Sequence, residues 1–475
     1  MTRLSTLFGG GLLLLAATAT PAAAQVVATY PVGTTTLTLS NLATGLNVPW
    51  HLEWGPDNFI WMTERVGRVS RIDPATGQVQ LVATIADVTQ TAESGLLGMA
   101  LVPNSVAGQP LWVYVVYNYT DGGTVKEKLV RFDYTNGALT NPTTILSNLA
   151  GAMYHNGSRV ILLPDRTLLM TTGDATNTSF AQDPQNLNGK ILRLNLDGTV
   201  PANNPTPGSL VYTRGHRNPQ GLVQVPATGF VYSSEHGPNN DDEVNKIEAG
   251  RNYGWPNVEG FCNLPAEQTF CAANNVREPL MAWTPTLAVS GLAHYNHPAI
   301  PEWSNSLLLN SLKAGRFQQL PLSAAGTTIN AANPLWNGTY GRLRAICVSP
   351  QGKIYIGTSN RDGSGAPGAT DDRILVLENR AYSTTATATG QLKKTFTLSP
   401  NPASSTATVQ FSAPLQAGAE LQVHDAMGRA VYRAIVPAGQ QQLTLPGQLW
   451  RSGMYTVRLA SGTQSFTTQR LVLTR

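Results

Sequence analysis

Apolar and polar residues alternate in short runs through most of residues 25–380, and the runs follow a recurrent order. A turn rich in Pro, Asp or Gly leads into an alternating strand that ends in Thr or Ser, and a second strand of the form Gly-x-apolar-x-Arg-apolar comes after it. Copies of this unit occupy residues 55–72, 163–194 and 349–377. Recurrent strand–turn–strand units are typical of a β-propeller, where radial repetition leaves only short sheet edges. A stretched β-sandwich would explain the alternation but not the recurrent order.

The pattern changes near the C-terminus. Residues 381–395 are small and polar with no apolar period, which is typical of a linker. Residues 396–475 return to short alternating strands separated by turns, and some eighty residues of this kind favour a small β-sandwich. We therefore predict an all-β protein with a propeller over 25–380 and a C-terminal β-sandwich. The clearest alternation in the C-terminal block lies in Ala407–Phe411, Leu421–His424 and Tyr455–Leu459.

Residues 1–24 have the pattern of a cleavable signal peptide. Arg3 supplies the positive start, Leu7–Ala17 the apolar stretch, and Ala22–Ala24 before Gln25 the small-residue cleavage site. A permanent anchor is the alternative, but the apolar run is short for a membrane core of about 30 Å. No later segment approaches that length, so we expect an exported protein whose mature chain has no transmembrane segment.

Composition supports these predictions and narrows the partners. The chain has 44 Gly, 31 Pro and 13% charged residues, against a usual charged share of roughly 25%, which favours tight turns between strands. A net charge of +4 without a Lys/Arg run argues against a nucleic-acid partner. Cys262 and Cys271 could close a local disulfide, as export allows, and Cys347 lies in an apolar strand pattern that predicts a buried thiol. Two cysteines make a poor zinc site.

Two loops contain residues suited to binding. In Gly215–Leu222, turn chemistry presents Arg217 beside Asn218, although the segment could simply be a hydrogen-bonded loop. Residues 235–243 crowd carboxylates, Asn side chains and Gly/Pro carbonyls together, which suits calcium with its six to eight oxygen ligands. The spacing of an EF-hand is absent, and a solvated acidic loop is the alternative.

Candidate catalytic and anion-binding groups lie where strands meet loops. His155 comes just before an apolar strand, where a neutral imidazole could take up a proton, although a lone His is more often structural. Lys313, Arg342 and Arg344 are cationic. Arg342 and Arg344 share one strand face, and they repel each other unless a carboxylate or a shared polyanion pairs with them. Two solvated arginines at a sheet edge are the alternative.

Taken together and in order, these segments resemble the soluble quinoprotein glucose and aldose-sugar dehydrogenase family over nearly all of residues 40–378. The resemblance implies a six-bladed propeller that holds pyrroloquinoline quinone (PQQ) and calcium at its axis. It also implies oxidation of aldoses to lactones at the anomeric carbon, with electrons passed to an external acceptor. The segments that carry the resemblance are Glu93–Gly98, His155–Arg159, Arg217–Asn218, Glu235–Pro238, Glu243, Tyr253, Trp283–Thr286, Ser311–Lys313 and Arg342–Arg344.

The resemblance also implies a role for each matching residue. His155 would be the catalytic base, and the remaining residues would bind the cofactor and calcium. Two positions depart from the family pattern: Glu93 stands where Gln is frequent, and Tyr154 stands where glucose-specific members have Asp. We therefore expect His155 to lack one orienting carboxylate. The implied cofactor-binding residues are Glu93, Arg217, Asn218, Thr286, Lys313, Arg342 and Arg344, and the implied calcium-binding residues are Gly237 and Pro238 (by their carbonyls), Glu243 and Tyr253.

The C-terminal block resembles the sorting domain of type IX secretion substrates. Leu398–Pro402, Asp425–Gly428 and Leu449–Tyr455 carry this resemblance, in the family's order. It implies that secretion machinery is a partner and that the protein is secreted or attached to the cell surface after passing through the periplasm. A generic carbohydrate-binding or adhesion sandwich is the alternative, but Trp450 is the block's only tryptophan and gives no aromatic platform.

Two other functions share the predicted fold. One is a calcium-dependent propeller hydrolase of the lactonase kind, which would have no use for three cations converging on the axis. The other is a non-catalytic extracellular binding propeller that has lost the cofactor, which the departures at Glu93 and Tyr154 would favour. Fold alone does not distinguish these functions from a dehydrogenase.

Overall fold

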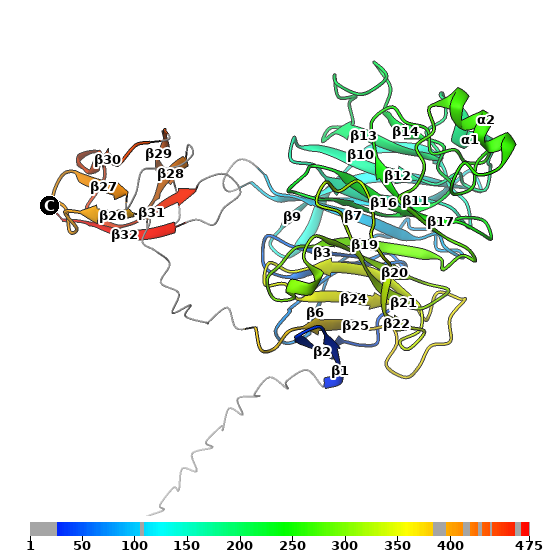
Figure 1. Ribbon diagram of the computed structural model, residues 1–475, viewed down its shortest axis with the longest axis horizontal. Helices are drawn as coiled ribbons and strands as arrows, with labels where there is room; N and C mark the ends of the chain where they lie inside the picture. The colour runs from blue at the N-terminus through cyan, green and yellow to red at the C-terminus, as the bar shows by residue number, and fades with distance from the viewer. Residues whose placement is uncertain are drawn as a thin grey trace, which may run out of the picture. The chain divides into compact units, whose positions relative to one another are not determined.

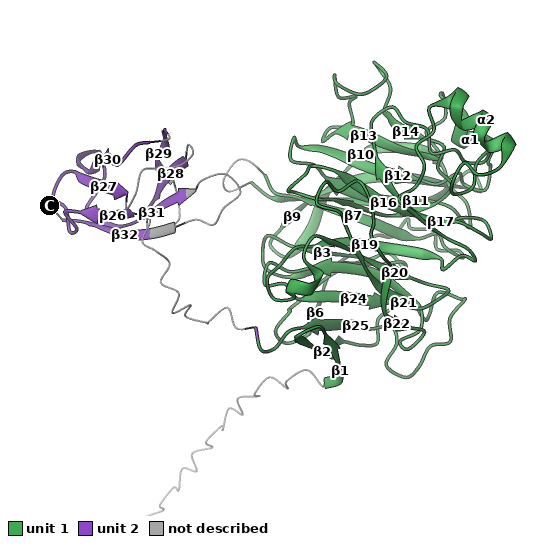
Figure 2. Ribbon diagram, in the orientation of Figure 1, with its two compact units in different colours: residues 1–381 green, residues 382–475 purple. Residues whose placement is uncertain are grey.

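The computed structural model describes residues 26–104, 109–382, 396–411, 419–425, 430–437, 439–460 and 467–474. The predicted signal peptide and nearly all of the predicted linker lie outside these ranges. The chain divides into two compact units, residues 1–381 and 382–475 (Figure 2). No helix among the described residues is long and apolar enough to cross a membrane.

The first unit consists of six antiparallel sheets arranged around an axis (Figure 1). Each innermost strand contacts the innermost strands of both neighbouring sheets, so the six close into a ring. From the inner strand outward, the sheets are β3 (Pro49–Trp54), β4 (Ile60–Glu64), β5 (Arg68–Ile72) and β6 (Val79–Thr84); β7 (Leu96–Val102), β8 (Leu111–Asp121), β9 (Thr124–Thr135) and β10 (Ala138–Ala150); β11 (Gly157–Leu162), β12 (Thr167–Thr172), β13 (Lys190–Asn195) and β14 (Val211–Arg214); β15 (Pro219–Gln224), β16 (Val231–Glu235), β17 (Asp242–Ile247) and β18 (Met281–Trp283); β19 (Val289–Tyr295), β20 (Ser306–Ser311), β21 (Arg316–Pro321) and β22 (Asn333–Asn337); and β23 (Leu343–Val348), β24 (Ile354–Thr358), β25 (Ile374–Glu378), β2 (Thr35–Ala43) and β1 (Val26–Val32).

The last sheet closes the ring with strands from both ends of the unit. β2, near the N-terminus, pairs antiparallel with β25, with Leu39 opposite Leu377. Separating the two ends of the unit would therefore break a full ladder of backbone hydrogen bonds. The predicted six-bladed propeller is confirmed.

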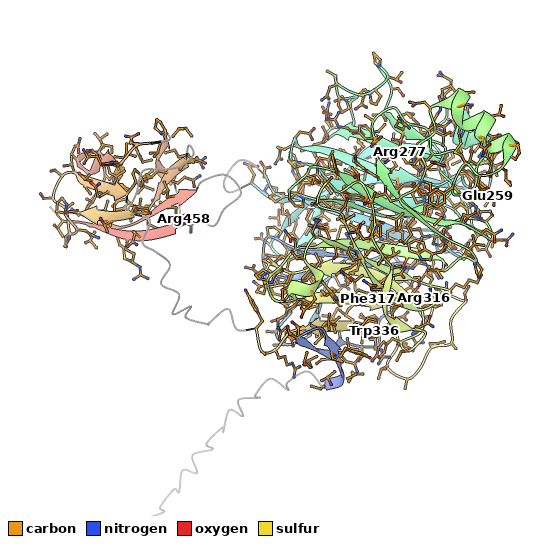
Figure 3. All side chains as sticks on the ribbon, viewed as in Figure 1. Glu259, Arg277, Arg316, Phe317, Trp336 and Arg458 are labelled. Atoms are coloured by element: carbon orange, nitrogen blue, oxygen red, sulfur yellow. A yellow bond between two sulfur atoms is a disulfide. The ribbon has the colours of Figure 1, made fainter. Side chains whose placement is uncertain are left out.

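Apolar side chains fill the spaces between adjacent sheets. Six clusters of buried residues occupy these spaces, one at each boundary between blades. In the cluster between the last two blades, the rings of Phe317 and Trp336 lie 5.0 Å apart (Figure 3). Burial on both faces explains why the inner strand β7 is apolar at nearly every position, while the outermost strand β1 alternates between exposed and less exposed residues.

The Thr or Ser that ends the alternating strand of many repeats, which is the second strand of its blade, joins neighbouring blades. The Thr63 hydroxyl donates to the Leu97 carbonyl of the next inner strand at 2.6 Å, and Thr171 donates to Pro219 at 2.8 Å. A hydroxyl is needed because these inner-strand carbonyls are buried and would otherwise lack a partner. Thr358 differs, because it bonds to Asp372 within its own sheet.

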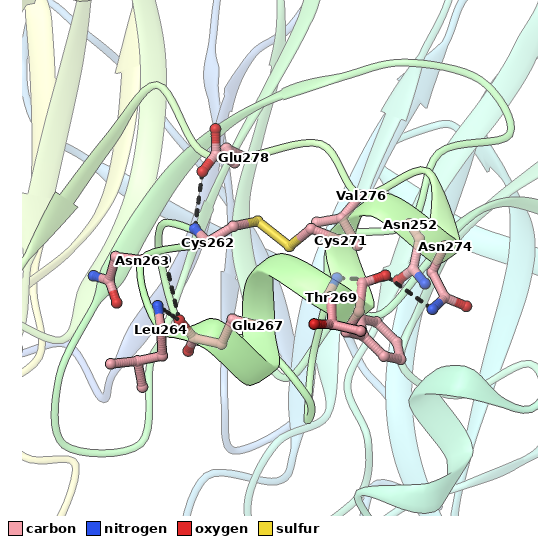
Figure 4. Close-up of a disulfide and its surroundings, with 12 residues drawn as sticks. Asn252, Cys262, Asn263, Leu264, Glu267, Thr269, Cys271, Asn274, Val276 and Glu278 are labelled. Carbon is pink, nitrogen blue, oxygen red and sulfur yellow. Dashed lines mark hydrogen bonds between the residues drawn. A yellow bond between two sulfur atoms is a disulfide. The ribbon is translucent and has the colours of Figure 1, made fainter.

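Short helices lie in the loops: α1 (Ser179–Gln182), α2 (Pro265–Asn274) and the 3₁₀ turn η1 (Pro301–Trp303). The predicted disulfide between Cys262 and Cys271 is confirmed, and it joins α2 to the segment before it (Figure 4). Glu278 accepts a hydrogen bond from the Cys262 amide at 2.8 Å, which fixes the same segment from the other side. Cys347 is a buried free thiol, as predicted.

The second unit is a β-sandwich, as predicted. One core contains side chains from both of its sheets, including Phe396, Val409, Leu421 and Val457. Trp450 belongs to this core, with its ring 5.4 Å from that of Tyr455, so it offers no exposed platform. The sheets are β26 (Phe396–Ser399), β27 (Ala407–Phe411) and β30 (Gln442–Leu445), and β29 (Ala430–Val436), β28 (Ala419–His424), β31 (Gly453–Ala460) and β32 (Thr467–Leu473), with the 3₁₀ turn η2 (Gly447–Leu449) before β31.

Candidate active site

The candidate residues gather at the end of the ring where the inner strands begin. His155 comes just before β11, Asn218 just before β15, and Arg342 just before β23. The Asn218 side-chain oxygen accepts a hydrogen bond from the Gly157 amide at 3.1 Å, which joins two of these strand starts. The fold therefore brings together residues that are far apart in the sequence.

His155 is held in an unusual backbone conformation. Its φ angle is +60°, in the left-handed region that non-glycine residues rarely adopt, and such strain is concentrated at functional sites. Gly173 lies against it so closely that a Cβ there would be 1.9 Å from the His155 carbonyl oxygen. About 20% of the His155 side-chain surface is exposed, so a substrate can reach the imidazole.

A buried carboxylate orients the imidazole. Asp174 Oδ1 lies 2.8 Å from His155 Nδ1, and the Asp174 side chain is fully buried. The same carboxylate accepts hydrogen bonds from the Thr176 amide at 2.8 Å and from Trp255 Nε1 at 2.9 Å. An ionised carboxylate only accepts, so this contact favours the His155 tautomer with the proton on Nδ1 and the lone pair on Nε2.

Asp174 was not predicted from the sequence, and it gives His155 an orienting carboxylate although Tyr154 supplies none. Tyr154 is 48% exposed, and Asp174 lies just beyond the next strand, β12. Gly157 pairs with Thr172 across β11 and β12, so residues just before 157 and just after 172 meet at one end of the sheet. That hairpin register was the available signal, because it places the carboxylate two residues beyond β12 beside His155.

Glu235 fixes the loop that carries Arg217 and Asn218. One of its oxygens accepts hydrogen bonds from the Arg217 and Asn218 amides, the latter at 3.3 Å. Its other oxygen lies 2.8 Å from Nδ1 of the buried His216. These hydrogen bonds to Glu235 and His216 therefore hold the main chain of this loop in place.

Several buried nitrogen atoms beside His155 have no partner among the described residues. Asn218 Nδ2, Arg217 Nε and His236 Nε2 are buried, and each lacks a hydrogen bond within the described residues. Burial, together with the nearby charges of Arg344 and Arg217, lowers the pKa of His236 to about 3. Asn218 Nδ2 and Arg217 Nε are donors, and unpaired buried donors are costly, so this cluster is suited to a ligand rich in acceptor oxygens.

Glu93 lies among arginines. Its charge raises the pKa values of Arg65, Arg217 and Arg344, although burial, the larger effect, lowers all three. Glu93 Oε2 also lies 3.5 Å from the His155 amide nitrogen. An anionic Glu93 is therefore compensated by its neighbours. Sequence reasoning missed Arg65.

Arg342 and Arg344 share one carboxylate. Arg342 Nε donates to Asp362 Oδ2 at 2.7 Å, and Arg344 Nη2 lies 4.0 Å from the same oxygen. These two charges hold the pKa of Asp362 below its usual value despite burial. Asp362, which was not predicted from the sequence, is the carboxylate that pairs with Arg342 and Arg344. Two guanidiniums on one carboxylate leave an excess positive charge.

Arg344 lies over the hub of the ring. Its Nη1 donates to Gln220 Oε1 at 2.7 Å, and Arg159 Nε donates to the Gln220 carbonyl at 2.8 Å. Both guanidinium groups lie over the Trp50 ring, at 5.9 Å for Arg344 and 4.3 Å for Arg159. Burial lowers the pKa of Arg344 to about 10 and that of Arg159 to about 9. Two buried cations on the axis favour an anionic ligand above them.

Lys313 is connected through Thr286 to the loop of residues 235–243, which the sequence analysis proposes for calcium. Its Nζ donates to Thr286 Oγ1 at 3.2 Å, and the Thr286 amide donates to the Asn239 carbonyl at 3.2 Å. Lys313 is exposed and has no ion pair within the described ranges. Its charge is therefore available to an anion near the loop.

Asp242 shapes the Gly237–Pro238 turn. It is fully buried and accepts hydrogen bonds from the Gly237 amide at 2.9 Å and the Leu287 amide at 2.7 Å. A Cβ on Gly237 would lie 1.9 Å from the Asn240 carbonyl oxygen, so only glycine fits the turn. The described residues contain no group of three or more His, Cys, Asp or Glu side chains arranged to hold a metal. A calcium ion here would therefore need backbone carbonyls, as the sequence analysis expects of Gly237 and Pro238.

Glu243 and Tyr253 line a small cavity beside that turn. Its volume is about 20 Å³, close to the room that one water molecule or one ion needs. Glu243 faces Glu235 across the β16–β17 ladder. Burial and the charge of Glu235 raise the pKa of Glu243 well above its usual value. A cation between these two carboxylates would remove that repulsion. Glu259, labelled in Figure 3, also lines the cavity.

Comparison with known proteins agrees with the fold. The family described as Glucose / Sorbosone dehydrogenase matches residues 46–367, and the Secretion system C-terminal sorting domain matches residues 397–474. Quinoprotein glucose dehydrogenase B of Acinetobacter calcoaceticus is 30% identical over 409 residues, covering 68% of this chain and 85% of that protein.

Solved structures give the same result. The PQQ-bound form of aldose sugar dehydrogenase from Streptomyces coelicolor is 33% identical with a TM-score of 0.63, covering 74% of this chain and 99% of that one. The apo-form of the soluble aldose sugar dehydrogenase from Escherichia coli is 25% identical with a TM-score of 0.63, covering 72% and 100%. The chain thus belongs to the glucose/sorbosone dehydrogenase family of oxidoreductases and carries a C-terminal secretion sorting domain.

Proposed function

We propose that this protein oxidises aldose sugars to lactones at the anomeric carbon, using PQQ and calcium bound at the hub of the propeller. An external acceptor would take the electrons. The first 24 residues would direct export to the periplasm, and the C-terminal unit would engage secretion machinery that releases the protein or attaches it to the cell surface. The match to the sorting domain supports this route.

One observation carries the cofactor assignment: the unpaired buried donors Asn218 Nδ2 and Arg217 Nε lie, with the buried His236 ring, beside the proton acceptor His155. PQQ has three carboxylates and an ortho-quinone, so its polar periphery is rich in acceptors. Asn218 and Arg217 would bind the quinone oxygens. Lys313, together with the excess charge of Arg342 and Arg344, would bind the carboxylates. Glu93 and Thr286 lie beside these cations.

Calcium would be held by backbone carbonyls at Gly237 and Pro238. A second, structural ion would lie in the small cavity with Glu243 and the Tyr253 carbonyl. When bound, PQQ supplies a two-electron oxidant that accepts hydride, and calcium supplies a Lewis acid that polarises the quinone carbonyl. Tight geometry around Gly237 and the buried Asp242 keeps the turn rigid without an ion.

His155 has the geometry of a general base toward the anomeric hydroxyl. Asp174 accepts a hydrogen bond from Nδ1–H, so the Nε2 lone pair is available to a sugar at the mouth of the site. As Nε2 takes up a proton, the Asp174 carboxylate stabilises the resulting imidazolium. The hydrogen bonds from Thr176 and Trp255 keep that carboxylate in place.

The test uses purified full-length protein freed of metal with a chelator. Calcium and PQQ are added back, and reduction of a redox dye is followed with a panel of aldoses. We expect sugar-dependent reduction that needs both additions. His155→Ala should still bind PQQ but lose nearly all turnover, while His297→Ala, remote from the site, should not.

Other outcomes would support the alternatives. Lactone hydrolysis without the quinone would favour a calcium-dependent propeller hydrolase. No activity in either assay would favour a non-catalytic binding propeller. Unchanged turnover in His155→Ala would remove His155 from its proposed role.

A further inference from the structure

Trp255 lines the small cavity that Glu243 and Tyr253 also line, and it connects this cavity to the His155–Asp174 pair. Its indole Nε1 donates to Asp174 Oδ2 at 2.9 Å, while Asp174 Oδ1 faces His155 Nδ1 at 2.8 Å. Within the described part of the chain, no other group donates to Oδ2. The indole therefore determines how the fully buried carboxylate is turned.

The main chain of Trp255 is itself held on both sides. Its amide donates to the Gly215 carbonyl at 3.1 Å, and its carbonyl accepts from Gln182 Nε2 at 2.6 Å. The Gln182 side chain also exchanges two hydrogen bonds with Asn252, at 2.9 and 3.0 Å. The Arg217 guanidinium lies 5.4 Å from the centre of the indole ring, over its face. These contacts leave the indole little freedom to rotate.

The short helix α1, which carries Gln182, is held in place by Lys190. Lys190 is fully buried, and its Nζ donates to the carbonyls of Phe180 at 2.6 Å, Ala181 at 3.1 Å and Asn188 at 2.9 Å. These contacts place the end of α1 against Trp255. Contacts from several segments that are distant in sequence thus hold the Trp255 N–H in one position. A tryptophan that only filled space would not need these contacts.

Removing this N–H would leave Oδ2 buried with no donor. The Thr176 amide would still donate to Oδ1, but the carboxylate could rotate about its Cβ–Cγ bond, and Oδ1 would be held less firmly opposite His155 Nδ1. The imidazole would lose its fixed orientation and tautomer, while the contacts to a bound sugar or cofactor would remain. The expected effect is thus on turnover and not on binding.

We infer that Trp255 is a positioning residue for the sugar oxidation proposed above, acting on His155 through the Asp174 carboxylate. This inference rests on the proposed function for its kinetic consequences. It concerns hydrogen bonds among this chain's own residues, so it can also be tested on protein without cofactor.

The kinetic test is a double-mutant cycle in the reconstituted full-length protein. Trp255→Phe keeps a ring but removes the N–H, and we expect kcat to fall about ten- to a hundredfold with KM within twofold, as for loss of one hydrogen bond to a charged group. Asp174→Asn should lower kcat too, and the double variant should match Asp174→Asn within twofold. Multiplying effects would show that Trp255 acts independently of Asp174 and would overturn the inference.

The matched control is Trp61→Phe. Trp61 Nε1 donates to an aspartate as well, at 3.1 Å from Asp57 Oδ1, but it lies in the core between the first two blades. This variant should lower the melting temperature and leave kcat within twofold of the wild type. An equal fall of kcat in Trp61→Phe and Trp255→Phe would mean that general destabilisation is the cause.

A second readout needs neither PQQ nor sugar. The Nδ1–H proton of His155 should give a downfield NMR resonance, assigned by its loss in His155→Ala. It should shift or broaden in Trp255→Phe and stay in place in Trp61→Phe. If Trp255→Phe does not fold, benzothienylalanine at position 255 replaces only the indole N–H. A resonance that stays in place would overturn the inference even if sugar oxidation is found, and a shift would uphold it even if sugar oxidation is not.

Discussion

Replacing Asp174 with Asn tests the central geometry of the site with almost no change in side-chain volume. The carboxylate accepts hydrogen bonds from His155 Nδ1, the Thr176 amide and Trp255 Nε1, at 2.8, 2.8 and 2.9 Å. An amide has one acceptor oxygen and one donor NH2. Because every partner of this side chain is a donor, the NH2 end of the amide must face another donor inside a fully buried site.

Both orientations of the side-chain amide in the Asp174→Asn variant would impair His155. If the NH2 faces Trp255, two donors meet and the amide is pushed out of position. If the NH2 faces His155, Nδ1 must accept and the proton moves to Nε2, the atom that should take the sugar's proton. A hydrogen bond to a charged group contributes about 1.5–3 kcal/mol. We therefore expect kcat to fall about ten- to 150-fold.

The assay is steady-state dye reduction at saturating PQQ and calcium, with kcat and KM measured separately. KM should stay within about twofold, because Asp174 is fully buried and lies behind the imidazole. Asp57→Asn is the control, because Asp57 also accepts from a tryptophan and an arginine but lies away from the site. A kcat for Asp174→Asn within twofold of the wild type would refute the reasoning.

Three further predictions concern stability. Burial raises the pKa of Glu127 from 4.5 to about 8, so between these pH values the unfolded chain loses this proton and the folded chain keeps it. The free energy of unfolding should therefore fall as pH rises through this window, by up to about 1.4 kcal/mol per pH unit. Glu127→Gln should remove this loss, so its melting temperature should gain on the wild type from pH 5 to 8; a constant difference would contradict this. Calcium should raise the melting temperature of the PQQ-free protein, and Glu243→Gln should remove much of the rise, whereas Asp121→Asn, at an exposed ion pair, should not. An equal rise in both variants would place the ion elsewhere. Replacing Cys262 and Cys271 with Ser should free a short loop whose closure by the disulfide contributes about 2–3 kcal/mol to stability. Limited proteolysis should therefore cut near α2 faster than in the wild type. Equal cleavage rates would show that the hydrogen bonds to Glu278 and Glu267 suffice to hold the loop.

The sequence by itself determined the architecture. Alternation with a period of two, turns at regular intervals and the recurrent Thr predicted blades, because a strand with one buried face imposes that alternation locally. The loss of alternation near residue 381 marked the end of the propeller pattern. The residues whose chemistry is intrinsic, such as the Arg217–Asn218 turn and His155, could likewise be recognised from neighbours in the chain.

Only the tertiary structure decided which groups meet. Asp174, Trp255, Arg65 and Asp362 have no local signature, because their partners come from other strands or other blades and depend on sheet register and ring closure. The role of the Thr in the repeat is similar: its hydroxyl reaches the next inner strand only once neighbouring blades pack. Periodicity fixes where a side chain points within its strand, whereas contact between distant segments depends on the packing of the whole ring.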